Sequence, residues 1–199
     1  MSEPNERVSR EVNHRLAPLA GEYEFDAVHT FIGFSAQHLV VGRVRGRFEV
    51  VQGHLVVGED LLASSVEITI ETKSLNTLMP MRDDDLRSAN FLDVGNYPYM
   101  TFRSSTIIEL ADGGWSVLGE LTIRDVTKPT ELLVQFRGAT TDSAGRTRIA
   151  FHASGSISRR DYGLNTELMT EAGSLLVGRD VALDMDIEAT LTSNAAPVS

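Results

Sequence analysis

Residues 181–191 read VALDMDIEATL, and apolar side chains occupy every second position of this stretch. Valine, leucine, methionine and isoleucine alternate there with aspartate and glutamate from Asp184 onward. Successive side chains of a β-strand point to opposite faces, so a two-residue period predicts one face toward water and one toward an apolar interior. The stretch therefore predicts a half-buried β-strand.

The same period recurs along most of the chain and predicts an all-β fold. The predicted strands are 22–27, 30–38, 43–57, 64–73, 99–110, 115–124, 130–141, 147–158 and 180–192. If the first two form one bent strand, the total is about eight. Asp- and Gly-rich turns at 111–114 and 142–145 make their flanking strands antiparallel neighbours. With little helix to cover them, such strands must close into a barrel or stack as two sheets.

The segment from Pro80 to Leu92 breaks this rhythm and predicts a helix lying against one barrel opening. Pro80 suits a first helical turn, and acidic residues are favourable near a helix start. Helical spacing turns one set of side chains toward the barrel, namely Leu78, Met81, Leu86 and Ala89, and another toward solvent, namely Asp83, Asp84 and Arg87.

Composition and charge limit the possible functions. The 199 residues suit one barrel domain over 21–192, with an N-terminal arm or short surface helix over 1–20 and a tail over 193–199. A net charge of -10 argues against nucleic acid as a partner, because it repels phosphate backbones. The chain contains no cysteine, which excludes disulfides and thiolate chemistry. Charged residues from Met1 to Leu16 leave no apolar stretch, so we expect no signal peptide, no stable membrane insertion and a cytoplasmic location.

The periodicity alone leaves open whether the interior is hollow or filled. A barrel of about eight strands either packs its interior with side chains or holds one small ligand. The inward phase mixes bulky groups with small ones, which are Gly46, Ser104, Thr106, Gly119, Ala153, Gly155 and Ala189. Small residues leave room for a ligand, but glycines also mark strand bends and close backbone approach. A hollow lined in this way would select long apolar molecules.

Short motifs along residues 21–192 resemble the YceI-like family, in order and in one register. They are Gly21-Glu22-Tyr23, Asp26, His29-Thr30, Phe34, His38-Leu39, Gly46-Arg47-Phe48, Arg82-Asp83, Leu86-Arg87-Ser88, Phe91, Asp93, Tyr97-Pro98, Phe102, Leu121-Thr122-Ile123-Arg124, Val126-Thr127-Lys128-Pro129 and Arg159-Arg160-Asp161-Tyr162-Gly163-Leu164. The resemblance implies a lipocalin-like antiparallel barrel of about eight strands with one or two short helices. It also implies an internal tunnel that holds a polyisoprenoid or a related long-chain amphiphile, and a homodimer.

This chain departs from the family pattern at two positions. Asp85 stands where the family usually has His before Leu-Arg, and Asp125 stands where it usually has Gly. A headgroup contact through that histidine therefore does not transfer to this chain.

We expect non-catalytic binding, storage or transport of a long-chain isoprenoid or quinone-like lipid, with no cofactor. The predicted tunnel wall consists of Phe25, Phe31, Phe34, Phe48, Phe102, Leu121, Phe136 and Phe151. Phe91 and Tyr97 are predicted to close one end, and His29 and His38 to line or cap the mouth. Three basic residues either attract a headgroup or make ordinary ion pairs, namely Arg124, Lys128 and Arg159.

Two other functions remain open at this point. One is an enzyme acting on an apolar substrate inside the barrel through a His and an acidic partner. No HxH, HExxH or G-x-S-x-G spacing supports a metal site or a hydrolase triad, so we expect neither. The other is a filled barrel that serves as a protein-interaction module. The apolar loop over 165–179 is interpreted as a lid over one barrel end or as a dimer contact.

Overall fold

The computed structural model describes residues 8–38, 42–164 and 177–194, and the fold is almost entirely β. The strands are β1 (Ser9–Val12), β2 (Arg15–Pro18), β3 (Gly21–Phe25), β4 (Phe31–His38), β5 (Gly42–Phe48), β6 (Val51–Val57), β7 (Ser65–Glu71), β8 (Leu75–Asn76), β9 (Tyr99–Glu109), β10 (Trp115–Ile123), β11 (Val126–Thr141), β12 (Thr147–Ser158) and β13 (Val177–Asn194). One α-helix, α1 (Pro80–Arg87), and three 3₁₀ turns, η1 (Leu61–Ala63), η2 (Thr72–Ser74) and η3 (Arg159–Tyr162), complete the described elements.

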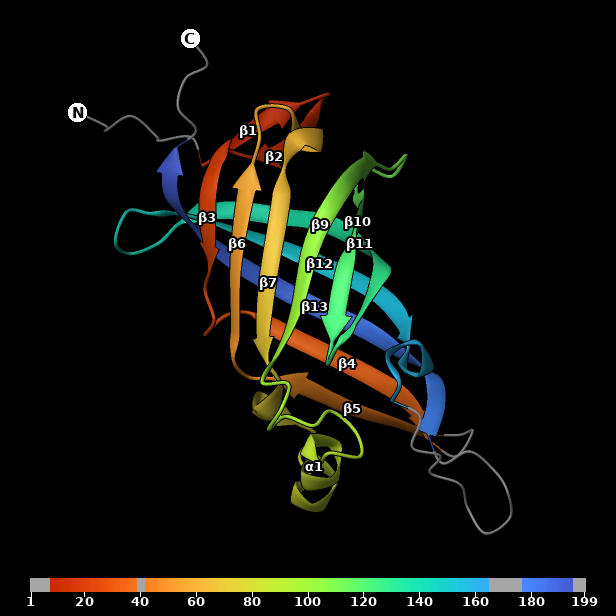
Figure 1. The fold of residues 1–199 in the computed structure, drawn as a ribbon. Helices are drawn as coiled ribbons and strands as arrows, with labels where there is room; N and C mark the ends of the chain where they lie inside the picture. Colours follow the sequence, from red (N-terminus) through yellow and green to blue (C-terminus); the bar gives the residue numbers. More distant parts are fainter. Residues whose placement is uncertain (1–7, 39–41, 165–176, 195–199) are drawn as a thin grey trace, which may run out of the picture.

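The long strand β13 organises the sheet into a closed antiparallel barrel. Strands β3 and β4 pair in succession along one side of β13, while β12 pairs along the other side and closes the barrel. Strands β5 and β6 pair with β4 and β3 in the same way. Strands β3 and β4 together therefore form one interrupted strand of the barrel, and β5 and β6 together form another. Counted in this way, the predicted eight-stranded barrel is confirmed (Figure 1).

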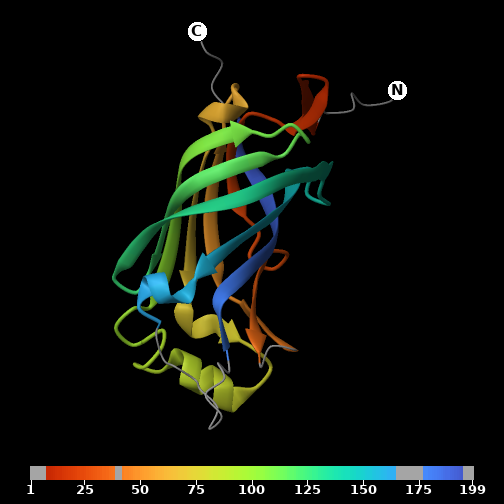
Figure 2. The same cartoon turned by 90° about the vertical axis from the view of Figure 1, so that its right-hand side faces the viewer.

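The two ends of this barrel differ in how completely the strands pair. Toward the β1–β2 end, β6 pairs with β7 along six residue positions from Val51 to Val56. Toward the α1 end, β5 leaves the β7 side, and within the described residues its one partner besides β4 is the two-residue β8. The segment that contains η2, β8 and α1 spans the resulting gap (Figure 2).

Helix α1 begins at Pro80 as predicted, but it ends at Arg87 and not at Leu92, and the predicted orientation of its faces is wrong. Leu78 is 90% exposed and Met81 is 76% exposed, whereas Asp83 is only 6% exposed. The Asp83 carboxylate accepts hydrogen bonds from the Thr77 backbone N–H (2.9 Å) and from the Thr77 hydroxyl, which turns this helix face inward. Of the side chains expected toward the barrel, Leu86 packs against the core and Ala89 is exposed.

A β-hairpin replaces most of the arm or surface helix that was expected over 1–20. Strands β1 and β2 pair antiparallel around Asn13 and His14, whose φ angles are 51° and 61°. Two consecutive positive φ angles are what a two-residue hairpin turn of the tight mirror-image type requires. Residues 1–7 lie outside the described part of the chain, as do 195–199 of the predicted tail and most of the 165–179 loop.

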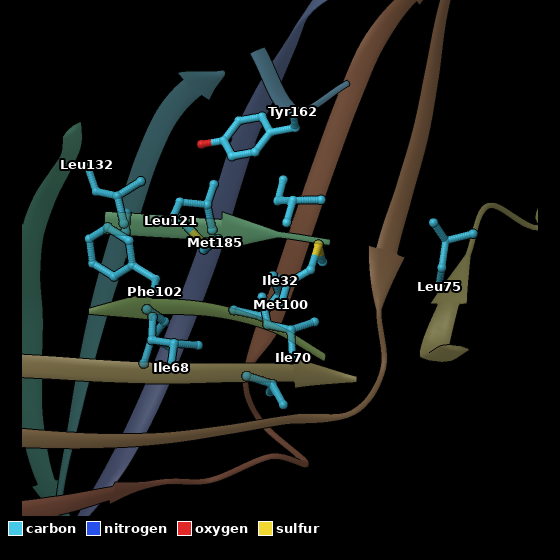
Figure 3. Close-up of a cluster of buried hydrophobic side chains, with 14 of the residues drawn as sticks. Ile32, Ile68, Ile70, Leu75, Met100, Phe102, Leu121, Leu132, Tyr162 and Met185 are labelled. Atoms are coloured by element: carbon cyan, nitrogen blue, oxygen red, sulfur yellow. The ribbon is translucent and has the colours of Figure 1, made fainter. Parts of the chain in front are cut away.

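The buried apolar residues form two clusters along the barrel axis. The larger cluster lies within the α1 half and the middle of the barrel, where Ile68, Phe102, Leu121 and Leu132 project inward from neighbouring strands (Figure 3). The smaller cluster contains Tyr23, Val57, Ile149 and Ala189. Its four members are at most 3% exposed, so side chains pack closely around them near the β1–β2 end.

Candidate functional site

An apolar cavity occupies the α1 half of the barrel. Its volume is about 450 Å³, and we call it the α1-side chamber. Its apolar wall comes from eight strands of the barrel, from β8, from the segment around α1 and from Leu164, which follows the η3 turn. It consists of Ile32, Phe34, Ala36, Val44, Phe48, Ile68, Ile70, Leu75, Leu86, Phe91, Leu92, Met100, Phe102, Leu121, Ile123, Leu132, Ile157, Leu164, Val181, Leu183 and Met185. The period-two pattern produces this wall, because the inward phase of each strand is apolar.

Polar groups of the α1-side chamber are few, and most come from α1 and the residues that follow it. Arg82, Asp85, Ser88 and Asn90 line the chamber from this segment, and we call these four residues the rim. The Arg82 guanidinium donates from Nε to the Thr77 hydroxyl (2.7 Å) and from Nη2 to the Thr77 carbonyl (2.8 Å). These bonds fix Arg82 beside the helix, so the chamber has one polar end.

Arg159 and Thr130 add polar atoms on the η3 side of the α1-side chamber. Arg159 is buried, and its guanidinium donates to the carbonyls of Gly178 (3.0 Å) and Leu164. The Thr130 hydroxyl lies 3.3 Å from the Tyr162 hydroxyl, and burial raises the pKa of Tyr162 despite that hydrogen bond. Arg159 therefore ties η3 to the start of β13 and also contributes to the chamber wall.

A second, smaller cavity continues the hollow toward the β1–β2 end. Its volume is about 90 Å³, and we call it the hairpin-side chamber. It is lined by Pro18, Phe25, Leu55, Val57, Leu61, Ser64, Val66, Ile68, Ile107, Trp115, Val117, Leu132, Val134, Phe151, Ala153 and Ile187. Ile68 and Leu132 line both chambers, so these two side chains form a shared waist.

Glycines in the wall allow aromatic rings to lie flat against the sheet. A Cβ atom on Gly46 would lie 2.4 Å from the Phe34 ring, and one on Gly119 would lie 2.5 Å from the Phe102 ring. Both interpretations of the inward glycines, as room for a ligand and as sites of close backbone approach, are therefore partly correct. Close approach of a ring to the backbone is what keeps that ring from filling the axis.

Most of the predicted wall residues line one of the two chambers, as does Phe91, which was predicted to close one end. Those in the α1-side chamber are Phe34, Phe48, Phe91, Phe102 and Leu121, and those in the hairpin-side chamber are Phe25 and Phe151. Phe136 lines neither, because it packs in the smaller cluster with its ring 5.3 Å from that of Phe151.

One predicted wall residue, one predicted end residue and one of the three basic residues lie away from the chambers, which corrects the prediction for Phe31 and Tyr97. Phe31 is 40% exposed, because β4 directs its neighbour Ile32 inward and the Phe31 ring covers Gly33. The Tyr97 ring lies beneath the Arg124 guanidinium, 5.4 Å from ring centroid to Cζ. Lys128 is exposed and lines a surface hollow.

The histidines lie outside the chambers, contrary to the expected mouth-lining role of His29 and His38. His29 is exposed in the β3–β4 turn, where Nδ1 lies 2.9 Å from Asp26 Oδ2, and His38 ends β4. His54 pairs with Glu24 (2.9 Å) and His152 pairs with Asp186 (3.1 Å). Among the described residues, no histidine lines either chamber, and no cluster of three or more His, Asp or Glu side chains could hold a metal ion.

Sequence reasoning assigned none of the four rim residues to the site, although the resemblance singled out the position of Asp85. The rim residues Arg82, Asp85, Ser88 and Asn90 carry no periodic signal, because they belong to a helix end and the turn after it. Trp115 and Val181 follow the predicted strand phase and could have been included on that ground.

No helix in the part of the chain that the structure describes is long and apolar enough to cross a membrane.

Comparisons with known proteins agree with this geometry. A family model described as the YceI-like domain matches residues 23–189. A UPF0312 protein of Yersinia enterocolitica is 36% identical over 153 residues, which cover 75% of this chain and 79% of that protein.

Solved structures share the fold at low sequence identity. The structure of BcnA from Burkholderia cenocepacia has a TM-score of 0.70 at 20% identity and covers 83% of this chain and 99% of its own. A polyisoprenoid binding domain from Saccharophagus degradans has a TM-score of 0.64 at 19% identity and covers 85% of this chain and 98% of its own. At these identities the two structures establish the barrel fold.

Proposed function

The chain belongs to the YceI-like domain family, and from this premise we propose that its α1-side chamber binds the tail of a long-chain isoprenoid or a related amphiphilic lipid. The observation that carries the proposal is an apolar cavity of about 450 Å³ whose polar groups gather mainly at the α1 end. Such a cavity matches a molecule with a long apolar tail and one polar headgroup.

The driving force is the transfer of the tail from water into the apolar wall. Each buried CH₂ group contributes about 0.8 kcal/mol, so a tail of several isoprene units binds without a charged anchor. Part of this gain offsets the cost of immobilising a flexible chain. The headgroup stays at the rim, where Arg82 and Asp85 provide a donor and an acceptor.

The proposed mechanism is binding, storage or transport without bond making or breaking. In the described part of the chain, the His–carboxylate pairs that an enzyme would use lie outside the chambers, on the partly or fully exposed His29, His54 and His152. The polyisoprenoid binding domain of Saccharophagus degradans supports the choice of an isoprenoid as the ligand class. The cytoplasmic location and the homodimer expected from the sequence stay predictions.

Solvent extraction of freshly purified protein followed by mass spectrometry tests this function directly. We expect a co-purifying prenyl lipid, or uptake of added prenyl alcohol by the extracted and refolded protein. A matched pair of variants places the ligand: Ala36→Trp fills the α1-side chamber, whereas Gln37→Trp adds the same ring on the exposed neighbour. Loss of uptake in Ala36→Trp alone supports the proposal. Protein that takes up no prenyl chain, or equal uptake in both variants, overturns it.

A further inference from the structure

The hairpin-side chamber has the features of a terminal pocket for an apolar chain. Nearly all of its lining is apolar, and Ser64 is the only residue with a polar side chain apart from the indole of Trp115. The rim residues all line the other chamber. A tail that enters at the rim therefore reaches the hairpin-side chamber last.

The waist between the chambers consists of movable side chains. Ile68 and Leu132 line both cavities, and both belong to strands whose backbones are held in register on each side. Rotation of an isoleucine or leucine side chain between staggered rotamers requires no backbone movement. The two chambers can therefore join into one continuous path.

The β1–β2 hairpin and the smaller buried cluster close the far end of this path. Pro18, the last residue of the hairpin, lines the hairpin-side chamber, as does Val57 of the smaller cluster. Leu61 and Trp115 line this chamber and also a mixed polar hollow beneath the hairpin. These two side chains and the hairpin therefore bound the chamber on the β1–β2 side.

Ion pairs and hydrogen bonds hold the hairpin in this position. Arg10 pairs with Glu59 (2.6 Å) and donates hydrogen bonds to the carbonyls of Pro18 (3.0 Å) and Gly58. Arg15 pairs with Glu109 (3.4 Å) on the other side of the barrel end. The hairpin precedes the region 23–189 that the family model matches, so this closure belongs to a part of the chain outside the family pattern.

Resting on the proposed function, we propose that the hairpin-side chamber receives the end of the lipid tail and that the β1–β2 hairpin stops it there. Pro18, Trp115 and Val134 then set the longest tail that the barrel accepts. Tails too short to pass the waist occupy the α1-side chamber only. Longer tails gain affinity until they fill the hairpin-side chamber, and any further length has no apolar site.

Trp115 is the only tryptophan in the chain and serves as a reporter for this pocket. The experiment titrates the full chain with all-trans prenyl alcohols of rising length, measures binding by native mass spectrometry and records Trp115 emission. We expect short alcohols to bind without changing the emission. Above a threshold length, the emission shifts, and beyond a second length affinity no longer rises.

Variants distinguish binding in the hairpin-side chamber from binding elsewhere in the barrel. Val134→Phe and Val66→Phe add a ring to the hairpin-side chamber from two different strands, and Leu133→Phe adds it on the exposed neighbour as a control. Both chamber variants are expected to weaken the binding of long alcohols about tenfold and to leave short alcohols unaffected, because each displaced CH₂ group loses its burial. Arg10→Ala is expected to release the hairpin and to extend the longest accepted tail.

The outcomes distinguish this inference from the proposed function. If no alcohol of any length binds, both are overturned. If alcohols bind but Trp115 emission never changes, or if a folded chamber variant binds long alcohols as tightly as Leu133→Phe, only the terminal pocket is overturned. An unchanged length limit in Arg10→Ala, together with a shortened limit in Val134→Phe, overturns the role of the hairpin.

Discussion

The α1 end and the β1–β2 end of the barrel are built from the same strands but differ in their interiors. At the α1 end, β5 leaves the β7 side, and the gap is spanned by a short helical segment around a cavity of about 450 Å³. At the β1–β2 end, β6 and β7 pair, and the interior narrows to a cavity of about 90 Å³ beside the buried cluster of Tyr23, Val57, Ile149 and Ala189. The hollow of the barrel is therefore wide where the sheet opens and narrow where the strands pair.

Replacing a fully buried residue of the smaller cluster near the β1–β2 end should have the largest effect on stability. Tyr23 is fully buried, and its hydroxyl donates to the Leu19 carbonyl (2.9 Å). Tyr23→Ala is expected to lower the free energy of unfolding by about 4 kcal/mol, since truncating a buried aromatic ring leaves a cavity. Urea unfolding measures this loss. Phe48→Ala, at the wall of the α1-side chamber, should cost less than half as much, and equal costs would remove the distinction between the two ends.

The polar support of α1 should have the next largest effect. Asp83→Ala leaves the buried N–H of Thr77 without its acceptor and is expected to cost about 2 kcal/mol. Asp84→Ala is the matched control, because Asp84 is exposed and only pairs loosely with Arg87 at 3.7 Å. We expect the control to change unfolding by less than about 0.5 kcal/mol. Similar thermal denaturation of the two variants would contradict the burial of Asp83.

A smaller effect on stability, but a clear one on capacity, is expected at Gly46. A methyl group there would displace the Phe34 ring into the α1-side chamber, at an overpacking cost of about 1–2 kcal/mol. Gly46→Ala should therefore reduce prenyl alcohol uptake, as measured by native mass spectrometry. Gly95→Ala is the control, because a Cβ atom at Gly95 would meet no atom within 4 Å. Unchanged uptake in Gly46→Ala would show that Phe34 can move without narrowing the chamber.

The smallest effect is expected at Asp26, where β3 passes toward β4 and the two halves of the barrel meet. Burial opposes ionisation of Asp26, but hydrogen bonds from His29, Arg148 and the Val28 N–H, together with the Arg148 charge, outweigh it and lower its pKa. A lowered pKa in the folded state stabilises the fold above the unfolded value of about 3.9, and this contribution is lost as the pH falls through the folded value.

Asp26→Asn should therefore lower stability at pH 7 by about 1 kcal/mol or less and flatten the decline of stability below pH 4. Unfolding curves between pH 2 and pH 7, compared with those of the native chain, provide the measurement. A decline of the same steepness in both proteins would assign the acid sensitivity to other carboxylates.

The barrel could be predicted from the sequence because apolar residues alternate with a two-residue period along its strands. The stretch 43–57 was expected as one strand, and β5 and β6 do run in succession along one path. The inward phase correctly included Phe34, Phe102 and Leu121 because strand alternation determines which side chains face the axis. Phe31 was misplaced because the phase of β4 starts at Ile32.

The features that the sequence did not predict depend on single hydrogen bonds. Helical spacing alone cannot show that hydrogen bonds from Thr77 hold Asp83 inward. No sequence pattern indicates that a charged side chain such as Arg159 is buried. The hairpin did carry a signal, since Asn13 readily adopts the positive φ that a tight turn requires. The size of the chambers depends on how rings pack over glycines, which no pattern along the chain records.

The most direct test of the central claim is a crystal structure of the chain after incubation with a long prenyl alcohol. We expect continuous density in the α1-side chamber, with the hydroxyl near Arg82 and Asp85 and the tail directed toward Ile68 and Leu132. A chamber filled instead by the Phe34 and Phe48 side chains, with the alcohol bound on the outer face of the barrel, would contradict it.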